Sequence, residues 1–131
     1  MTTTIKIYPD GIKVNGGELI RCTYAFDNPI DRPERGCSII IIADAGKLPT
    51  DIFNVEPCDA YIDYSGMDSA VITRDHPLYY YVWYAAYKAK VDSIRADIAR
   101  GVTPWSYAMR ICDLFKAYPN PGQPSDDILG A

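Results

Sequence analysis

The residues best suited to chemistry in this chain gather in one short segment, CDAYIDYSGMD at positions 58–68. Its three acidic side chains, Asp59, Asp63 and Asp68, are spaced four to five residues apart, with tyrosines between them. A calcium loop alternates its oxygen ligands and usually ends on a glutamate, and this segment does neither. A glycosidase needs two carboxylates across a cleft, but any acidic protein can supply such a pair. We therefore expect no metal here. Two interpretations stay open: a segment that recognises a ligand or partner, and a solvated strand and turn.

Covalent catalysis has little support elsewhere in the sequence. His76 is the only histidine, and its place before Pro77 is typical of a helix start, with Asp75 as the alternative cap. The sequence contains no Gly-x-Ser-x-Gly motif, no Cys-His signature and no glycine-rich phosphate loop. The four cysteines form no Cys-x-x-Cys pair, and we expect them to be reduced and packed as small apolar side chains: Cys22, Cys37, Cys58 and Cys112. We therefore predict a protein that is not an enzyme and needs no cofactor.

The charge of the chain is uneven. Its 131 residues carry a net charge of −4 and fit one domain. Residues 1–75 hold 7 Lys and Arg against 12 Asp and Glu, a net −5, whereas residues 76–131 hold 6 against 5, a net +1. This balance argues against binding to duplex nucleic acid, which needs a basic surface, but a few arginines can still bind a small anion. The chain starts without a cationic, apolar signal region and has no run long enough to span a bilayer, so we expect a cytoplasmic protein without membrane contact.

The first half of the chain reads as strands joined by turns. Apolar and polar residues alternate, and Pro9-Asp10-Gly11 and Asn15-Gly16-Gly17 are turn signals. Four consecutive isoleucines at positions 39–42 indicate a central strand that is buried on both faces. The segments AYIDY and SAVIT, around Ser65-Gly66, predict two short strands or one bent strand. The remaining predicted strands span residues 3–8, 11–14, 18–26 and 37–43, with an exposed loop over 27–36 and an irregular stretch over 44–60.

The second half changes to a helical period. A helix over about residues 77–100 would place six apolar side chains within an arc of about 80°: Tyr80, Tyr84, Tyr87, Val91, Ile94 and Ile98. Tyr79 and Trp83 fall on a flank of this stripe, which favours a subunit interface, with peripheral core packing as the alternative. A second helix is predicted over residues 104–118, and Pro119 ends it. The predicted fold is a single α+β domain over residues 1–118, a small antiparallel sheet followed by a C-terminal two-helix hairpin, with a poorly ordered proline-rich tail over 119–131.

Residues 36–82 resemble the phage Thoeris anti-defence proteins, which act as sponges for cyclic ADP-ribose signals. The resemblance rests on a hydrophobic strand, a Leu-Pro, a D-x-x-x-D-Y-x-x-x-D segment and a Pro-Leu-Tyr that opens a helix. It covers about 45 of the 131 residues, and the matching positions are Asp59, Asp63, Tyr64, Asp68, Pro77, Leu78 and Tyr79. Ser65-Gly66 and Ser69-Ala70 stand where such proteins carry aromatic and charged residues.

The resemblance implies a homo-oligomer that binds a nucleotide-derived signal without converting it. Arg74 precedes the predicted helix, where an anion would also meet the helix N-terminus. A pyrophosphate needs an arginine or backbone donors and an adenine needs an aromatic face, so the implied ligand-binding residues are Tyr64, Asp68, Arg74 and Tyr79. Two other classes stay open. An acidic first half suits an inhibitor of a basic immune effector of the anti-CRISPR type, and a small virion component would need no ligand.

Overall fold

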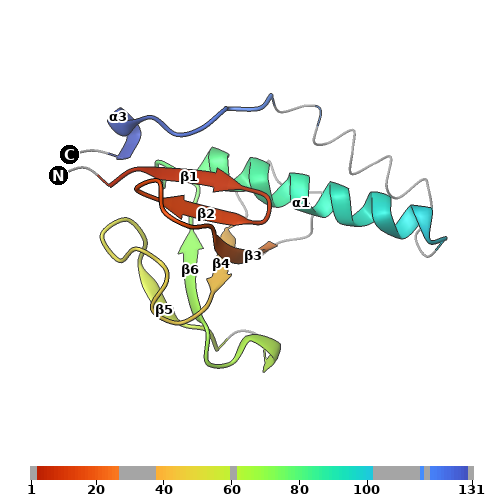
Figure 1. Ribbon diagram of the computed structural model, residues 1–131, viewed down its shortest axis with the longest axis horizontal. Coiled ribbons are helices and arrows are strands. Elements are labelled where there is room, and N and C mark those ends of the chain that lie inside the picture. Colours follow the sequence, from red (N-terminus) through yellow and green to blue (C-terminus); the bar gives the residue numbers. More distant parts are fainter. Residues whose placement is uncertain (1–2, 27–37, 60–61, 102–115, 117–118, 130–131) are drawn as a thin grey trace.

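The computed structural model describes residues 3–26, 38–59, 62–101, 116 and 119–129. One antiparallel sheet forms the first layer, and in the described part of the chain one long helix, α1 (Tyr79–Ala99), lies against one face of the sheet (Figure 1). The α+β class with an antiparallel sheet is confirmed. No described helix is both long and apolar enough to cross a membrane.

Six strands build the sheet in the order β1-β2-β3-β4-β6-β5, and every neighbouring pair is antiparallel. Three of the predicted strands appear at their predicted places with ends shifted by up to two residues, and the strand predicted over 11–14 matches at both ends. β5 lies in the stretch that was predicted to be irregular. The strands are β1 (Ile5–Tyr8), β2 (Gly11–Val14), β3 (Ile20–Phe26), β4 (Ile39–Ala43), β5 (Val55–Pro57) and β6 (Asp68–Ile72).

β3 changes partner after its first two residues. Its first two residues pair with β2, and the pairing with β4 begins at Cys22. The β1–β2 hairpin comes very close to β3 at Gly11, where an added Cβ would lie 2.1 Å from the Ile20 carbonyl oxygen. Glycine is needed at this crossing because it has no Cβ. The second half of β3 therefore has β4 on one side and no strand of the described chain on the other.

The central strand β4 is buried on both faces, as the four isoleucines predict. Ile39 and Ile41 face α1 and join the main core, whereas Ile40 and Ile42 face away from the helix. On that second face they pack with Cys58, and Tyr64 and Met67 cover them. An antiparallel sheet usually exposes one face to water, so this central strand needs a cover on each side.

The segment 58–68 supplies that second cover, which corrects the prediction of two strands around Ser65-Gly66. Ile62–Tyr64 forms a short 3-10 helix, and only the residues after it form a strand, β6. The Cys58 amide donates to the Met67 carbonyl over 2.8 Å, so the segment closes on itself. Asp63 therefore lies in a helical turn, and the acidic side chains do not line one face of a strand.

α1 confirms the predicted helix, and Tyr87, Val91 and Ile94 of the predicted stripe are buried. The first half of the helix, however, buries a different side from the predicted one. Tyr87 is fully buried, whereas Tyr80 is 59% exposed. The residues buried in its first half are instead Tyr79, Val82, Trp83, Ala85 and Ala86. The expectation that Tyr80 lies on the buried stripe was wrong, because the first turns of this helix are apolar on nearly every side and the sheet decides which side is covered. Lys88, Asp92 and Arg95 are exposed.

The C-terminal helical hairpin is not part of the described structure. The predicted second helix over 104–118 and the predicted loop over 27–36 fall almost entirely outside the described residues. Beyond α1 the described chain contains one short helix, α3 (Asp126–Leu129).

Residues 119–129 belong to the proline-rich tail, and the structure describes where they lie. The segment runs back beside β1, so that α3 lies near the N-terminal end of the chain (Figure 1). The Gln123 side chain makes two hydrogen bonds to the backbone of Ile7, and Pro124 is buried. A proline-rich segment has few conformations to lose on ordering, so two good hydrogen bonds and a buried ring can hold it.

The turn before α1 is held by the histidine ring. His76 Nδ1 accepts a hydrogen bond from the Leu78 amide over 3.0 Å, so Nε2 carries the proton and donates to the Ile52 carbonyl over 3.1 Å. The ring also stacks on Phe53, with centroids 5.8 Å apart. His76 thus ties the start of α1 to the loop between β4 and β5.

We expect His76→Phe to lower the free energy of unfolding by about 1–3 kcal/mol, since the ring stays while two backbone groups lose their partners. Chemical denaturation monitored by circular dichroism measures the change. The neighbouring Asp75→Ala, at an exposed position, is the matched control and should stay within about 0.5 kcal/mol. Equal losses for the two variants would contradict the role given to the His76 ring.

Candidate functional site

The four residues implied as ligand-binding by the resemblance do not come together. Tyr64 packs against Ile40 and Ile42 on the face of the sheet that is turned away from α1. Tyr79 is 3% exposed and belongs to the core between the sheet and α1. A whole sheet therefore separates the two aromatic rings.

Asp68 and Arg74 are also apart. Asp68 begins β6 and Arg74 follows its end, so six residues of nearly extended chain, about 20 Å, separate them. The Asp68 carboxylate accepts a hydrogen bond from the Gly46 amide over 2.9 Å, which gives it a structural contact. Arg74 is exposed in the turn that leads to α1.

Tyr79 and Trp83 do not form the second contact surface that was predicted for a subunit interface. Trp83 is 4% exposed, and its ring lies 4.4 Å from that of Tyr87. Both side chains are part of the core because α1 turns this flank toward the sheet. The alternative of core packing is the one that the structure shows.

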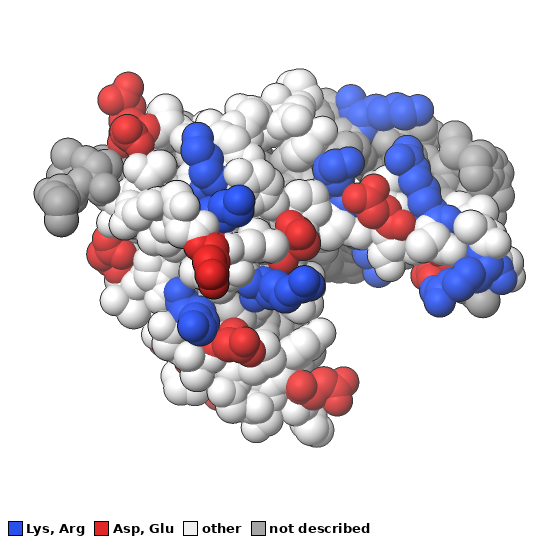
Figure 2. Space-filling view, viewed as in Figure 1, with Lys and Arg blue, Asp and Glu red and all other residues white. Residues whose placement is uncertain are grey.

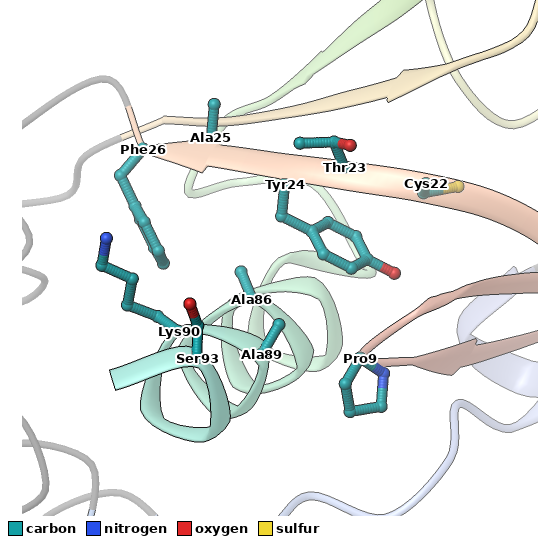
Figure 3. A pocket seen from close by; sticks show the side chains of 10 residues that line it. All are labelled: Pro9, Cys22, Thr23, Tyr24, Ala25, Phe26, Ala86, Ala89, Lys90 and Ser93. Carbon is teal, nitrogen blue, oxygen red and sulfur yellow. The ribbon is translucent and has the colours of Figure 1, made fainter. Parts of the chain in front are cut away.

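A pocket of about 530 Å³ opens between the second half of β3 and the middle of α1. Figure 3 shows Tyr24 and Phe26 pointing from β3 toward the helix, with Ala86 and Ala89 opposite them. Lys90 and Ser93 lie on the same side of the pocket as Phe26, and Pro9 of the β1–β2 turn lies at the other end (Figure 3). The volume is within the range of about 300–1,000 Å³ that is usual for small-molecule sites.

The local sequence explains the hollow. In β3 the side chains at positions 22, 24 and 26 face α1 because alternate residues of a strand point to the same side. On α1 the facing positions 86 and 89 are alanines, three residues apart on one helix face. Two large aromatic rings opposite two methyl groups leave space between the layers.

The aromatic walls of the pocket are fixed. The Tyr24 hydroxyl donates to the Tyr8 carbonyl over 2.7 Å, which fixes the phenol at the end near the β1–β2 turn. The Phe26 ring meets Tyr87 edge to face, with centroids 4.6 Å apart. Such contacts reduce the freedom that a ring would otherwise lose when it binds a ligand.

The backbone of β3 adds polar groups to the pocket. The Cys22 amide donates to the Asp10 carbonyl over 3.2 Å, so the backbone groups of Cys22 point to the β2 side. By the alternation of an antiparallel strand, those of Tyr24 and Phe26 point the same way. In the described chain β2 pairs with β3 only as far as Arg21, so β2 does not take up the donors and acceptors of these two pocket-lining residues.

The helix side brings a positive charge. Among the described residues the ion pairs of α1 are Lys88–Asp92 and Arg100–Asp97, and Lys90 belongs to neither. Figure 2 shows both signs of charge interspersed on the viewed face, with Lys and Arg predominating toward the end where α1 finishes. Lys90 and the Ser93 hydroxyl therefore form a small cationic, hydrogen-bonding end of the pocket, suited to an anion.

The titratable groups deep in the pocket are held neutral. Burial raises the pKa of the Cys22 thiol to about 12. Burial, with smaller effects from Cys22 and Asp10, raises the pKa of the Tyr24 phenol well above its ordinary value. The thiolate is the nucleophilic form of cysteine, so at neutral pH Cys22 offers a packing surface to a ligand.

Sequence reasoning missed this pocket. The alternation of β3 does place residues 22, 24 and 26 on one face, and that signal is in the sequence. The pairing of this face with Ala86, Ala89 and Lys90 depends on which side of the first half of α1 is buried, and the sequence did not predict that side correctly. Comparison of the chain with protein-family models, with curated proteins and with solved structures finds no match.

Proposed function

We propose that this protein binds and retains a nucleotide-derived small molecule without converting it, and that the pocket between β3 and α1 is the binding site. The pocket carries the proposal because it combines three kinds of contact that such a ligand needs. Aromatic rings at Tyr24 and Phe26 suit a base, and Lys90 suits a phosphate. The β3 backbone groups that pair with no strand of the described chain suit the hydrogen-bonding edge of the base. The neutral thiol and phenol supply no nucleophile or base at pH 7.

The resemblance of residues 36–82 makes signals of the cyclic ADP-ribose type the first candidates, and a phage counter-defence role is the corresponding biological proposal. The proposed site differs from the one that the resemblance implied, since it uses β3 and α1 rather than Tyr64, Asp68, Arg74 and Tyr79. Assembly into homo-oligomers stays a prediction, and sedimentation with and without the ligand measures it.

The test is thermal unfolding with a panel of cyclic nucleotides and cyclic ADP-ribose isomers. A ligand that binds only the folded state stabilises it by about 2.7 kcal/mol at a hundredfold excess over the dissociation constant. We expect Lys90→Ala to remove most of the shift, because the anionic end loses its cation. Arg74→Ala is the matched control, since it removes one positive charge from an exposed turn outside the pocket.

Each outcome separates the candidate sites. Loss of the shift in Arg74→Ala but not in Lys90→Ala would move the site to the turn before α1 and overturn the pocket. If no compound shifts the unfolding temperature, the alternative of an inhibitor that binds a basic effector protein remains. Binding of the protein to a basic effector at low salt tests that alternative. Chromatography of the recovered ligand checks retention, and a converted ligand would contradict the absence of catalysis.

A further inference from the structure

We propose that the groove between β1 and the first turns of α1 recognises extended, proline-rich peptides, and that the chain's own residues 119–124 are its resident occupant. This groove is separate from the pocket between β3 and α1, so the proposal is independent of the function proposed above. Its two walls are the outer edge of β1 and the aromatic side of α1.

Gln123 already makes the hydrogen bonds to the edge of β1 that a bound peptide would make. The Gln123 side-chain amide donates to the Ile7 carbonyl over 3.0 Å and accepts from the Ile7 amide over 2.8 Å. This is the donor–acceptor pair that a neighbouring strand would make with the open edge of a sheet. The Thr4 hydroxyl adds a contact of 3.4 Å to the Asp126 carboxylate farther along the same edge.

The helix wall has the composition of a proline-binding surface. A hollow of about 420 Å³ lies between the start of α1 and the tail. On the tail side it is lined by Pro119 and Pro121. On the helix side it is lined by Pro77, Tyr80, Tyr81, Trp83 and Tyr84. Domains that bind polyproline segments use aromatic-lined grooves of this kind, because the preformed peptide loses little entropy. Tyr80 is 59% exposed on this wall.

The resident segment fills only part of the groove. A second hollow of about 240 Å³ lies on the β1 side, lined by Tyr8, Lys88 and Gln123 among others, and Asn120 borders both hollows. The segment PNPGQP has three prolines in six residues. A partner with a longer proline-rich segment that also carries a glutamine would satisfy the β1 edge and fill the remaining space, and it would displace the tail.

The test measures binding of a labelled synthetic peptide, PNPGQPSDD, to the full chain by fluorescence anisotropy. A tethered segment competes at an effective concentration on the order of millimolar, so we expect weak binding to the wild-type chain. Gln123→Ala loosens the tail and should tighten peptide binding by at least tenfold. Adding Tyr80→Ala to Gln123→Ala should lose that gain, and so should a peptide with alanine in place of its glutamine.

The control for the aromatic wall is Ile62→Ala in the Gln123→Ala background. Ile62 is an exposed apolar side chain far from this groove, so its loss should leave peptide binding unchanged. Thr4→Val, which removes the contact to Asp126, provides a second loosened variant with a smaller gain of the same sign. The proposal is overturned if neither loosened variant binds the peptide more tightly than the wild-type chain, or if the peptide without glutamine binds equally well.

Discussion

Replacement of Tyr87 by alanine should lower the free energy of unfolding by about 3–5 kcal/mol, the usual cost of truncating a buried aromatic ring. Tyr87 is fully buried and contacts two other rings, Phe26 on β3 and Trp83 one turn earlier on α1. Its loss would open a cavity at the point where the helix meets the sheet. Urea denaturation followed by circular dichroism measures the midpoint and slope.

Tyr80→Ala is the control, because both tyrosines belong to the stripe that the sequence predicts as core. Tyr80 is more than half exposed in the structure, so we expect its replacement to change stability by no more than about 0.5 kcal/mol. If the two variants lost equal stability, the difference in burial between Tyr87 and Tyr80 would be contradicted. Because the Phe26 ring packs against Tyr87, Tyr87→Ala should also lower the affinity of the β3–α1 pocket for its ligand.

Stability should fall steeply above about pH 9. The Cys22 thiol ionises near its ordinary value of 9.0 in the unfolded chain, but burial raises its folded-state pKa to about 12. Between these values the unfolded state holds fewer protons than the folded state. Stability is therefore lost as the pH rises, by up to about 1.4 kcal/mol per pH unit for one group. Tyr24 adds to the loss above pH 10, because its pKa is raised in the same sense.

Cys22→Ala isolates the contribution of the thiol. Between pH 9 and 10 the unfolded-state ionisation of Tyr24 is only beginning, so the variant should lose stability with a flatter slope than the wild-type chain. Equilibrium unfolding in a reducing buffer at several pH values gives both slopes. Parallel slopes would show that the Cys22 thiol is not shielded as its burial indicates.

Some parts of this structure follow from local sequence. Alternating residues and glycine turns place the first four strands, and the run Ile39–Ile42 specifies a strand buried on both faces. The long helix also follows from its period and from the proline at its start. These features depend on neighbours within a few residues, whose sterics and hydrogen bonds are the same in any context.

Other parts depended on contacts between distant residues. The segment around Ser65-Gly66 closes as a loop because Cys58 bonds to Met67 and because Tyr64 finds an uncovered face of β4. Gln123 meets Ile7 across 116 positions, and no local pattern marks that pair. A proline-rich composition predicts disorder only when the segment finds no surface to bind.

For the described residues, the sequence by itself therefore determined the elements: a meander of strands, a central strand buried on both faces and the long helix α1. Only the tertiary structure decided which side of the first half of α1 is buried, and with it the two sites proposed for this protein. The physical reason is that tyrosine and alanine surround the first turns of α1. Burial of the predicted side and burial of the side observed in the structure therefore remove a similar apolar area from water. The sheet breaks this tie by fitting Tyr79, Trp83 and Tyr87 against its core, which leaves Tyr80 exposed beside the tail and places the alanines opposite Tyr24 and Phe26.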